Sequence, residues 1–430
     1  MKYRKPIMQK LGVTFPALTY KNFRWFWFGQ CVSLIGSWVQ TTTQGWLVLQ
    51  IVGENTGFSL GVINALQFTP VMLFSLFAGV IIDRFSKRKI LIFTQIGLMV
   101  MALVQATLVF TGVIQFWQLA IIALIVGCIN TIDMPARQSF VIELVGKDSL
   151  MNGIALNSTA FNGARILGPA VAGIIIAYVG IEMCYFINAI SFIPVIYGIY
   201  KINVAEVKSD KNKDMLREIK DGLSYIKGNR ILVKTFAMIS VMGIFAFNYN
   251  ILIPLFAVDV LGLTSKGYGF LMSALGVGSL VGAVTVAAKS KRGPRYKVIV
   301  AAAYIVSLIL VILGINRQKY IMAGLLAFIG IFNIAFSTSA NSTVQLNSKD
   351  EYRGRVMSVY TLFFAGVAPI GSLFTGTIAN GFGPARAFVL SGIIASICIT
   401  AINLFDKFWK KEEIRSIRKT TDTEMKNRNI

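Results

Sequence analysis

The feature that most constrains the fold of this chain is a series of twelve apolar runs separated by short polar segments. An α-helix needs about 20 apolar residues to cross the ~30 Å hydrocarbon core of a bilayer. Backbone groups in lipid must be paired internally, so such runs are expected to form helices. The runs lie at roughly 25–50, 59–81, 90–111, 117–138, 150–178, 183–201, 235–258, 269–289, 298–316, 320–343, 356–379 and 386–407. The sequence therefore predicts an all-α membrane protein with twelve transmembrane helices.

Positive charge is distributed unevenly between the loops. Of the 42 Lys and Arg, only Lys266, Arg317, Lys319 and Arg386 fall in loops assigned to the outside, and Arg165 falls within a span. Cytoplasmic loops of membrane proteins carry an excess of Lys and Arg, so both termini are expected in the cytoplasm. The net charge of +23 then reflects orientation and some attraction to anionic membrane lipids. Nucleic-acid binding is not expected.

Several classes of chemistry find no support in the residues. The chain has no histidine, and its four cysteines (Cys31, Cys128, Cys184 and Cys398) lie far apart in separate spans. Imidazole catalysis, metal clusters and disulfides are therefore not predicted. No Gly-x-x-x-x-Gly-Lys-Ser/Thr stretch occurs, so hydrolysis of nucleotides within this chain is not expected. We expect no cofactor, no metal and no enzymatic activity.

A constant offset of 203 residues relates the two halves of the chain. Gly79 recurs as Gly282, and three further glycines, Gly168, Gly173 and Gly180, recur as Gly371, Gly376 and Gly383. A fixed period of this kind indicates duplication. We predict a six-helix bundle at 1–201, a cytoplasmic linker with an amphipathic helix at 202–234, and a second six-helix bundle with a cytoplasmic tail at 235–430. Transporters built from repeats bind substrate between their halves.

Four stretches resemble a known family of transporters. Residues 79–89, GVIIDRFSKRK, resemble the signature loop of the major facilitator superfamily, with Ser86 where the family usually has glycine. Residues 162–173, NGARILGPAVAG, are similar to the glycine-proline motif of span five in its antiporters. Residues 21–30, KNFRWFWFGQ, and 133–138, DMPARQ, resemble the bacterial branch of macrolide, drug and siderophore exporters. The resemblance covers nearly the whole chain and implies a monomer in the bacterial cytoplasmic (inner) membrane.

The signature loop implies a gate at the inner membrane edge. Its candidate residues are Gly79, Asp83, Arg84, Lys87, Arg88, Asp133 and Arg137. Asp83 could pair with Arg137 or Arg88, or face a helix N-terminus such as that of span eleven, in one state and lose this contact in another. The second half has Val286 at the corresponding position, so the gate is predicted to be asymmetric. The alternative is a positively charged loop with one incidental acid.

Asp133 is the candidate for proton coupling. None of the 19 carboxylates lies at the middle of a predicted span, and proton antiport usually relies on a buried titratable acid. Asp133 comes nearest to this requirement, with Asp83 as a possible partner. Asp133 and Arg137 are spaced i, i+4 on one helix face. They could therefore equally form a local structural pair.

Arg165 is the residue that most needs an explanation, because it lies near the middle of span five. A charge there costs roughly 2.5–3.5 kcal/mol on insertion scales. Ser158, Asn162 and Arg165 share one helix face, which predicts that this face lines a cavity. A buried structural partner for Arg165 is the alternative. Gly168, Pro169 and Gly173 follow in the same span, and either bend the helix or allow close packing.

Neutral polar side chains in other spans predict a large amphipathic cavity. The candidates are Gln40, Thr43, Gln44, Trp46, Asn64, Gln67, Asn248, Asn250 and Asn333, in addition to the face of Arg165. Asn248 and Asn250 interrupt span seven, the repeat counterpart of span one. Taken one at a time, each residue could instead join helices by hydrogen bonds within the bundle.

These features favour one function over its rivals. We predict a secondary active transporter that exports a small amphipathic or hydrophobic compound by alternating access, with protons as the coupling ion. The alternatives are uptake or facilitated transport of a nutrient or lipid, and a membrane receptor or assembly factor that does not transport.

Overall fold

The computed structural model describes residues 15–146, 148–203, 215–288 and 296–405. The N-terminal half consists of η1 (Pro16–Thr19), α2 (Lys21–Ile51), α3 (Thr56–Arg84), α4 (Lys87–Phe110), α5 (Phe116–Val145), α6 (Leu150–Tyr178) and α7 (Ile181–Lys201). A linker helix, α8 (Met215–Lys227), precedes the second half. Helix α6 begins at Leu150, only a few residues after α5 ends. The helices of this half are joined by such short turns and run antiparallel.

The C-terminal half repeats this plan with two broken helices. It consists of α9 (Arg230–Val241), the π-helical η2 (Met242–Ala246), α10 (Tyr249–Asp259), α11 (Ser265–Ala288), α12 (Tyr296–Ile315), α13 (Lys319–Leu346), α14 (Asp350–Ala365), α15 (Ala368–Phe382) and a last helix, Pro384–Phe405. The first of these elements begins at Arg230, five residues before the predicted boundary. The first break falls at Phe247–Asn248 and so includes Asn248, whereas Asn250 lies in the first turn of α10. The last helices of the two halves begin 203 residues apart.

Eleven spans in the described residues are long and apolar enough to cross a membrane. The remaining long helix, α2, has 31 residues and falls short in hydropathy because of its polar stretch from Gln40 to Gln44. It packs against α6 and α7 as the first helix of the N-terminal bundle. The predicted fold class, an all-α membrane protein of two six-helix bundles, is confirmed.

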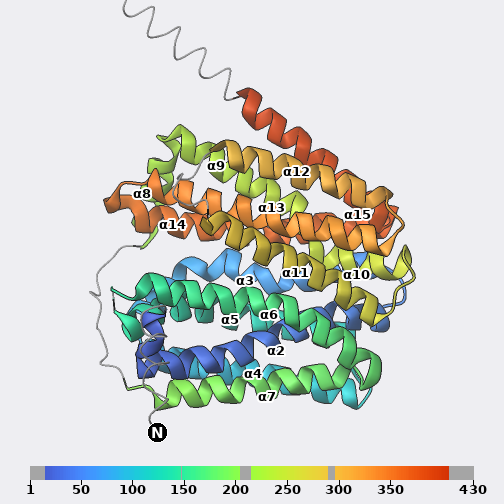
Figure 1. Ribbon diagram of the computed structural model, residues 1–430, viewed down its shortest axis with the longest axis horizontal. Coiled ribbons are helices and arrows are strands. Elements are labelled where there is room, and N and C mark those ends of the chain that lie inside the picture. The colour runs from blue at the N-terminus through green and yellow to red at the C-terminus, as the bar shows by residue number, and fades with distance from the viewer. Residues whose placement is uncertain (1–14, 147, 204–214, 289–295, 406–430) are drawn as a thin grey trace, which may run out of the picture.

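Figure 1 shows the two halves as neighbouring bundles, with the N-terminal half in blue to green and the C-terminal half in yellow to red. Glycines bring helices close within the N-terminal bundle. A Cβ at Gly29 of α2 would lie 2.6 Å from the Cα of Val195, and one at Gly198 of α7 would lie 2.5 Å from the Trp25 oxygen. Only glycine fits at such positions. Small residues serve this purpose in membranes, where apolar burial alone does not drive helices together.

The bundle has two chemically different ends. We call the end with η1, the turn from Arg84 to Lys87 and linker helix α8 the basic end. The end where α2 meets α3 and α6 meets α7 is the opposite end. The two halves contact each other chiefly through α3 with α15 and α6 with α11. The glycines at these contacts, described below, lie towards the opposite end.

The linker helix α8 packs against the start of α14 at the basic end (Figure 1). Tyr225 stacks on Tyr352 with ring centroids 4.6 Å apart, and its hydroxyl donates to the Asn347 oxygen at 3.3 Å. Arg355 forms an ion pair with Asp221 at 3.4 Å. The linker helix is therefore attached to the C-terminal half by both stacking and charge.

Candidate functional site

A cavity of about 680 Å³ lies between the two halves. Its walls come from α3 and α5 on one side and from the region around Phe247, α10, α13, α14 and α15 on the other. The residues contributed by α5 and α14 place it from the middle of the bundle towards the basic end. A volume of this size falls within the range of about 300–1,000 Å³ typical of small-molecule sites.

The lining of this large cavity is aromatic and neutral. Its polar members are Asn64, Ser75, Asn130, Thr131, Gln138, Asn248, Asn250, Asn341, Ser358, Thr361 and Ser372, and its aromatic members are Phe68, Phe247, Tyr360 and Phe364. Of the described residues that line it, none is Asp, Glu, Lys or Arg. Such a wall suits a molecule with an apolar body and a few hydrogen-bonding groups.

A second cavity of about 90 Å³ lies beside the first and contains Arg165. It is lined by Trp38, Arg165, Phe247, Tyr249, Asn250, Met272 and Leu275. Phe247 and Asn250 line both cavities. The guanidinium lies over the Trp38 ring, 5.6 Å from its centroid, a contact that attracts a cation to an aromatic face. On the far wall, Tyr249 donates to Asn333 at 3.3 Å.

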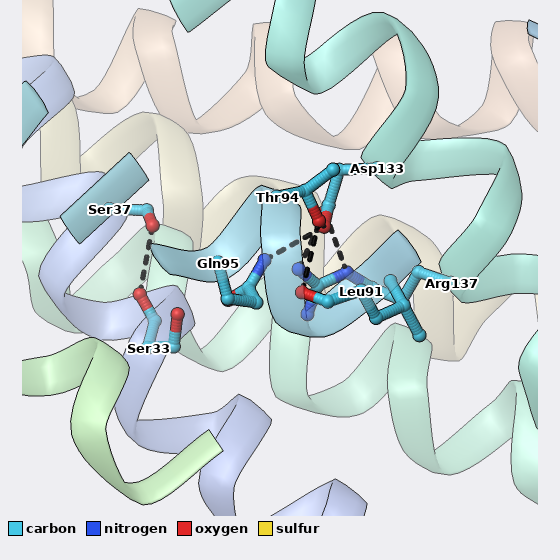
Figure 2. A network of polar contacts seen from close by, with 7 residues as sticks. All are labelled: Ser33, Ser37, Leu91, Thr94, Gln95, Asp133 and Arg137. Carbon is cyan, nitrogen blue, oxygen red and sulfur yellow. Dashed lines mark hydrogen bonds and ion pairs between the residues drawn. The ribbon is translucent and has the colours of Figure 1, made fainter. Parts of the chain in front are cut away.

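A buried polar network surrounds Asp133 in the N-terminal bundle (Figure 2). Thr94 donates to one carboxylate oxygen at 2.6 Å, and Gln95 donates to the same oxygen at 2.8 Å. Arg137 donates to the other oxygen from two nitrogens, at 3.1 and 2.6 Å. Asp133 is 2% exposed, so four hydrogen bonds compensate for the loss of water around its charge.

Asp133 lies directly behind the wall of the large cavity. Its neighbours Thr131, Met134 and Pro135 line that cavity, whereas its own carboxylate points to α4. Pro135 removes one backbone donor from the middle of α5, which makes this part of the helix easier to deform. A change at the carboxylate can therefore reach the cavity through a few residues of α5.

The basic residues of the signature loop contact the N-terminal half itself. Lys87 forms an ion pair with Glu143 at the end of α5. Arg88 donates to the backbone oxygens of Ile199 at 3.1 Å and Tyr200 at 2.6 Å, at the end of α7, and Arg84 is exposed. The side chain of Asp83 and the surroundings of Gly79 lie outside what the structure describes.

The glycine-proline stretch of α6 packs against two helices. A Cβ at Gly168 would lie 2.4 Å from the Trp38 Cβ of α2. Gly173 faces the C-terminal half, where its Cβ would lie 2.8 Å from the Ser265 oxygen, and a Cβ at Gly269 would lie 2.5 Å from the Pro169 oxygen. These distances exclude any larger residue without movement of α6 relative to α2 or α11.

Two further groups of contacts close the opposite end. A Cβ at Gly376 of α15 would lie 2.7 Å from the Gly57 oxygen and 2.9 Å from the Gly61 Cα, both in α3. Asn380 donates to Asn55 across the two halves at 2.7 Å. The halves are thus in backbone contact at the opposite end, while the large cavity separates them towards the basic end.

Comparisons with known proteins identify the family of this chain. Residues 13–427 match the family model described as transmembrane secretion effector, a branch of the major facilitator superfamily. The chain belongs to this family. It is therefore a multi-pass membrane transporter and not an enzyme.

Curated relatives of this family member include efflux proteins. The chain is 26% identical to the staphyloferrin A transporter of Staphylococcus aureus over 395 residues, covering 89% of this chain and 95% of that protein. It is 25% identical to macrolide efflux protein A of Streptococcus pyogenes over 397 residues, with the same coverage. It is 24% identical to the multidrug efflux pump Tap of Mycobacterium tuberculosis over 374 residues, covering 84% and 88%.

Solved structures support the major facilitator fold. A bacterial homologue of the human lysosomal transporter Spinster, in an inward-facing and unoccupied conformation, matches with a TM-score of 0.71 and 10% identity, covering 91% of this chain and 98% of that one. The nucleoside transporter NupG matches with a TM-score of 0.70 and 11% identity, covering 90% and 99%. At these identities the likeness concerns the fold alone.

The structure of this transporter divides the predicted cavity residues into two groups. Asn64, Asn248 and Asn250 line the large cavity, and Arg165 and Asn250 line the small one. Asn333 lies one contact behind the small cavity, through Tyr249. Ser158 is exposed and Asn162 donates to its backbone oxygen at 2.8 Å, and neither is among the residues that line the two cavities.

The predicted residues of span one lie elsewhere in the transporter. Gln40 donates to Gln105 of α4 at 2.7 Å and accepts from Asn188 of α7, so it joins three helices within the N-terminal bundle. Thr43 is buried and donates to the Val39 oxygen. Gln44 and Trp46 of the same span are partly buried and line neither cavity, and Trp46 stacks on Tyr268 with centroids 5.9 Å apart. Gln67 of span two is also partly buried and lines neither cavity.

Several lining residues escaped the sequence analysis. Asn130 and Gln138 of α5 line the large cavity together with Met134 between them. Their i, i+4, i+8 spacing places them on one helix face and could have identified α5 as a cavity wall. Tyr249, on the far wall of the small cavity, lies between the two asparagines that interrupt span seven and was not itself a candidate. Trp38 gave no signal of its own in a helix rich in aromatic residues.

Proposed function

We propose that this transporter exports small amphipathic compounds from the cytoplasm by alternating access, driven by exchange for protons. The observation that carries the proposal is the large cavity between the halves, with its aromatic and amide lining and no charged residue among the described ones. A wall of this kind accepts apolar molecules of varied shape, because it offers hydrogen bonds without demanding a particular charge. The efflux proteins among its relatives favour the same class of substrate.

The arrangement of the halves supports alternating access. With the basic end on the cytoplasmic side, as the charge distribution predicts, this state would receive substrate from the cytoplasm. The contacts of Gly173 with α11 and of Gly376 with α3 close the other side. Export requires these contacts to break and the halves to close at the basic end, around the signature loop that contains Asp83.

Coupling to protons would act through Asp133. Protonation removes the charge that holds Arg137 and the donors Thr94 and Gln95 in place. Met134 and Pro135 line the cavity on the same turn of α5. Loss of the ion pair between Asp133 and Arg137 would therefore change the shape of the cavity wall. Protonation of Asp133 and binding of substrate would then favour different conformations of α5.

A transport assay tests this proposal directly. Cells that carry the protein should accumulate less of a macrolide or a neutral fluorescent dye than cells that carry an empty vector. Purified protein in vesicles should then move the same compound when a pH gradient is imposed, and stop when a protonophore removes the gradient. Movement that is independent of the gradient would reject proton coupling, and higher accumulation in the cells with protein would reject export.

A further inference from the structure

Arg165 carries a positive charge near the middle of α6 that no described acid compensates. Within the described part of the chain, no carboxylate forms an ion pair with Arg165. Its aromatic contact with Trp38 uses one face of the guanidinium and leaves its N–H donors available. An arginine at this depth in a membrane protein normally pairs with an acid or faces a water-filled cavity. Arg165 lines the small cavity.

The small cavity has the composition of a site for an anionic group. Its volume of about 90 Å³ exceeds the space of ~10–15 Å³ that a single water molecule needs. Besides the guanidinium, the amide of Asn250 and the phenol of Tyr249 lie in its wall, and the remaining lining is apolar. The rigid fork of N–H donors in arginine matches the two oxygens of a carboxylate.

The small cavity is continuous in its lining with the large one. Phe247 and Asn250 belong to both, so the two cavities adjoin at these side chains and a molecule that occupies both would pass between them there. We propose that the cavity at Arg165 is an anion subsite, and that the preferred substrates are amphipathic molecules that carry one carboxylate. Their apolar body occupies the large cavity and their carboxylate binds Arg165. This inference rests on the proposed transport function and specifies the substrate class of the same site.

Both halves of the protein build this anion subsite. Trp38 and Arg165 belong to the N-terminal half, whereas Tyr249 and Asn250 belong to the C-terminal half. The halves touch at the same level, where Ser273 of α11 donates to the Ile166 oxygen at 2.9 Å. Opening of the opposite end separates α6 from α10 and α11 and takes the subsite apart. The anion is thereby released on the side that opens.

Matched pairs of acids and amides test the anion subsite by binding alone. The probes are acetate and acetamide, benzoate and benzamide, and 2-naphthoate and 2-naphthamide, measured on the purified protein by calorimetry and by thermal shift. Each pair has nearly the same shape and differs in charge. We expect 2-naphthoate to bind wild type roughly tenfold or more tightly than 2-naphthamide, with smaller differences for the smaller pairs.

Substitutions then assign the preference to Arg165. Arg165→Gln should reduce the ratio for the naphthyl pair to within about twofold, and Arg165→Lys should give an intermediate ratio because a point charge lacks the fork. Arg386→Gln removes an exposed arginine that lines neither cavity and should leave the ratio unchanged. If Arg165→Gln fails to fold, a wild-type ratio in Arg165→Lys overturns the proposal.

The remaining outcomes separate the anion subsite from the transport proposal. If none of the three acids binds wild type more tightly than its amide, or if the preference persists in Arg165→Gln, the subsite does not exist. Transport of 2-naphthamide in vesicles without any acid preference would preserve the export proposal and reject the subsite. An acid preference that depends on Arg165, in a protein that transports neither these probes nor the macrolide or dye of the transport assay, would preserve the subsite and reject export.

Discussion

Arg137 donates two hydrogen bonds to a single oxygen of Asp133, which precedes it by four residues in α5. The other oxygen of Asp133 accepts from Thr94 and Gln95 of α4. One buried carboxylate thus holds an arginine on its own helix and two polar side chains on the neighbouring helix (Figure 2). Removal of its charge affects the contact between the two helices as well as the ion pair.

Asp133→Asn should therefore separate coupling from transport. An amide cannot carry the proton, so transport driven by a pH gradient should fall to background while exchange of substrate down its own gradient continues. Vesicle assays with and without an imposed gradient measure both. Loss of both activities would assign Asp133 a purely structural role, and retention of both would place coupling at another residue.

The same substitution should lower stability, because it leaves Arg137, whose side chain is 16% exposed, without a counter-charge. Breaking a buried pair by removing one partner typically costs about 3–5 kcal/mol, and thermal unfolding in detergent measures the loss. The double variant Asp133→Asn with Arg137→Gln removes both charges and should recover much of that stability. A double variant as unstable as the single one would show that the pair itself contributes little.

Asp83→Asn tests the gate at the basic end. Asp83 occupies the penultimate residue of α3, next to a loop that forms contacts through Lys87 and Arg88. If its charge stabilises only the state that is closed at the basic end, the variant should insert normally and transport slowly. Transport at the wild-type rate, in a variant expressed at the wild-type level, would remove Asp83 from the gate.

A cross-link at the opposite end should hold the protein in the conformation described here and thereby stop transport. Asn55 and Asn380 are joined by a hydrogen bond across the two halves. Cysteines introduced as Asn55→Cys and Asn380→Cys, with the four native cysteines replaced, should be bridged by a short reducible reagent. Transport should fall to background after bridging and return after reduction, whereas the reagent should have no effect on Asn55→Cys alone. Full transport by a protein whose bridge is verified by mass spectrometry would contradict alternating access.

The amides of Gln40 and Asn250 should contribute to different properties, Gln40 to stability and Asn250 to substrate preference. Gln105→Met deprives Gln40 of its acceptor inside the N-terminal bundle, so we expect a loss of about 1–3 kcal/mol in stability without a change in substrate preference. Asn250→Ala alters the walls of both cavities and should change substrate preference with a smaller effect on stability. Thermal unfolding and competition between a panel of compounds measure the two effects. A reversed pattern would place Gln40 in the cavity and Asn250 in the scaffold.

The difference between these two amides also marks the limit of sequence reasoning. Run length predicted the twelve helices, because lipid imposes length and composition directly, and the 203-residue repeat predicted the two halves. The same signals do not indicate which face of each helix points inward. Lipid and protein interior are both apolar, so no gradient of polarity marks the inner face as it does in a soluble helix. Gln40 in α2 and Asn250 in α10 look equally like cavity residues in the sequence.

Contacts between residues far apart in the chain were also beyond prediction. Gln40 meets Asn188 across 148 residues, and helix spacing carries no information about such a partner. Asp133 and Arg137 were recognisable as a pair because they are four residues apart. Their donors Thr94 and Gln95 on another helix were not.

At the opposite end, backbone lies against backbone where Gly376 meets Gly57 and Gly61. Dispersion forces between atoms in contact lose a quarter to a half of their strength over a gap of ~0.5–1 Å. If α3 and α15 separated only partly, they would lose this attraction while the gap between them is still too narrow to admit water. Intermediate separations of the two helices are therefore unfavourable. Distance measurements between labels at this end should give two separate populations, one with short and one with long distances. The two conformations should be separated by a single activation barrier.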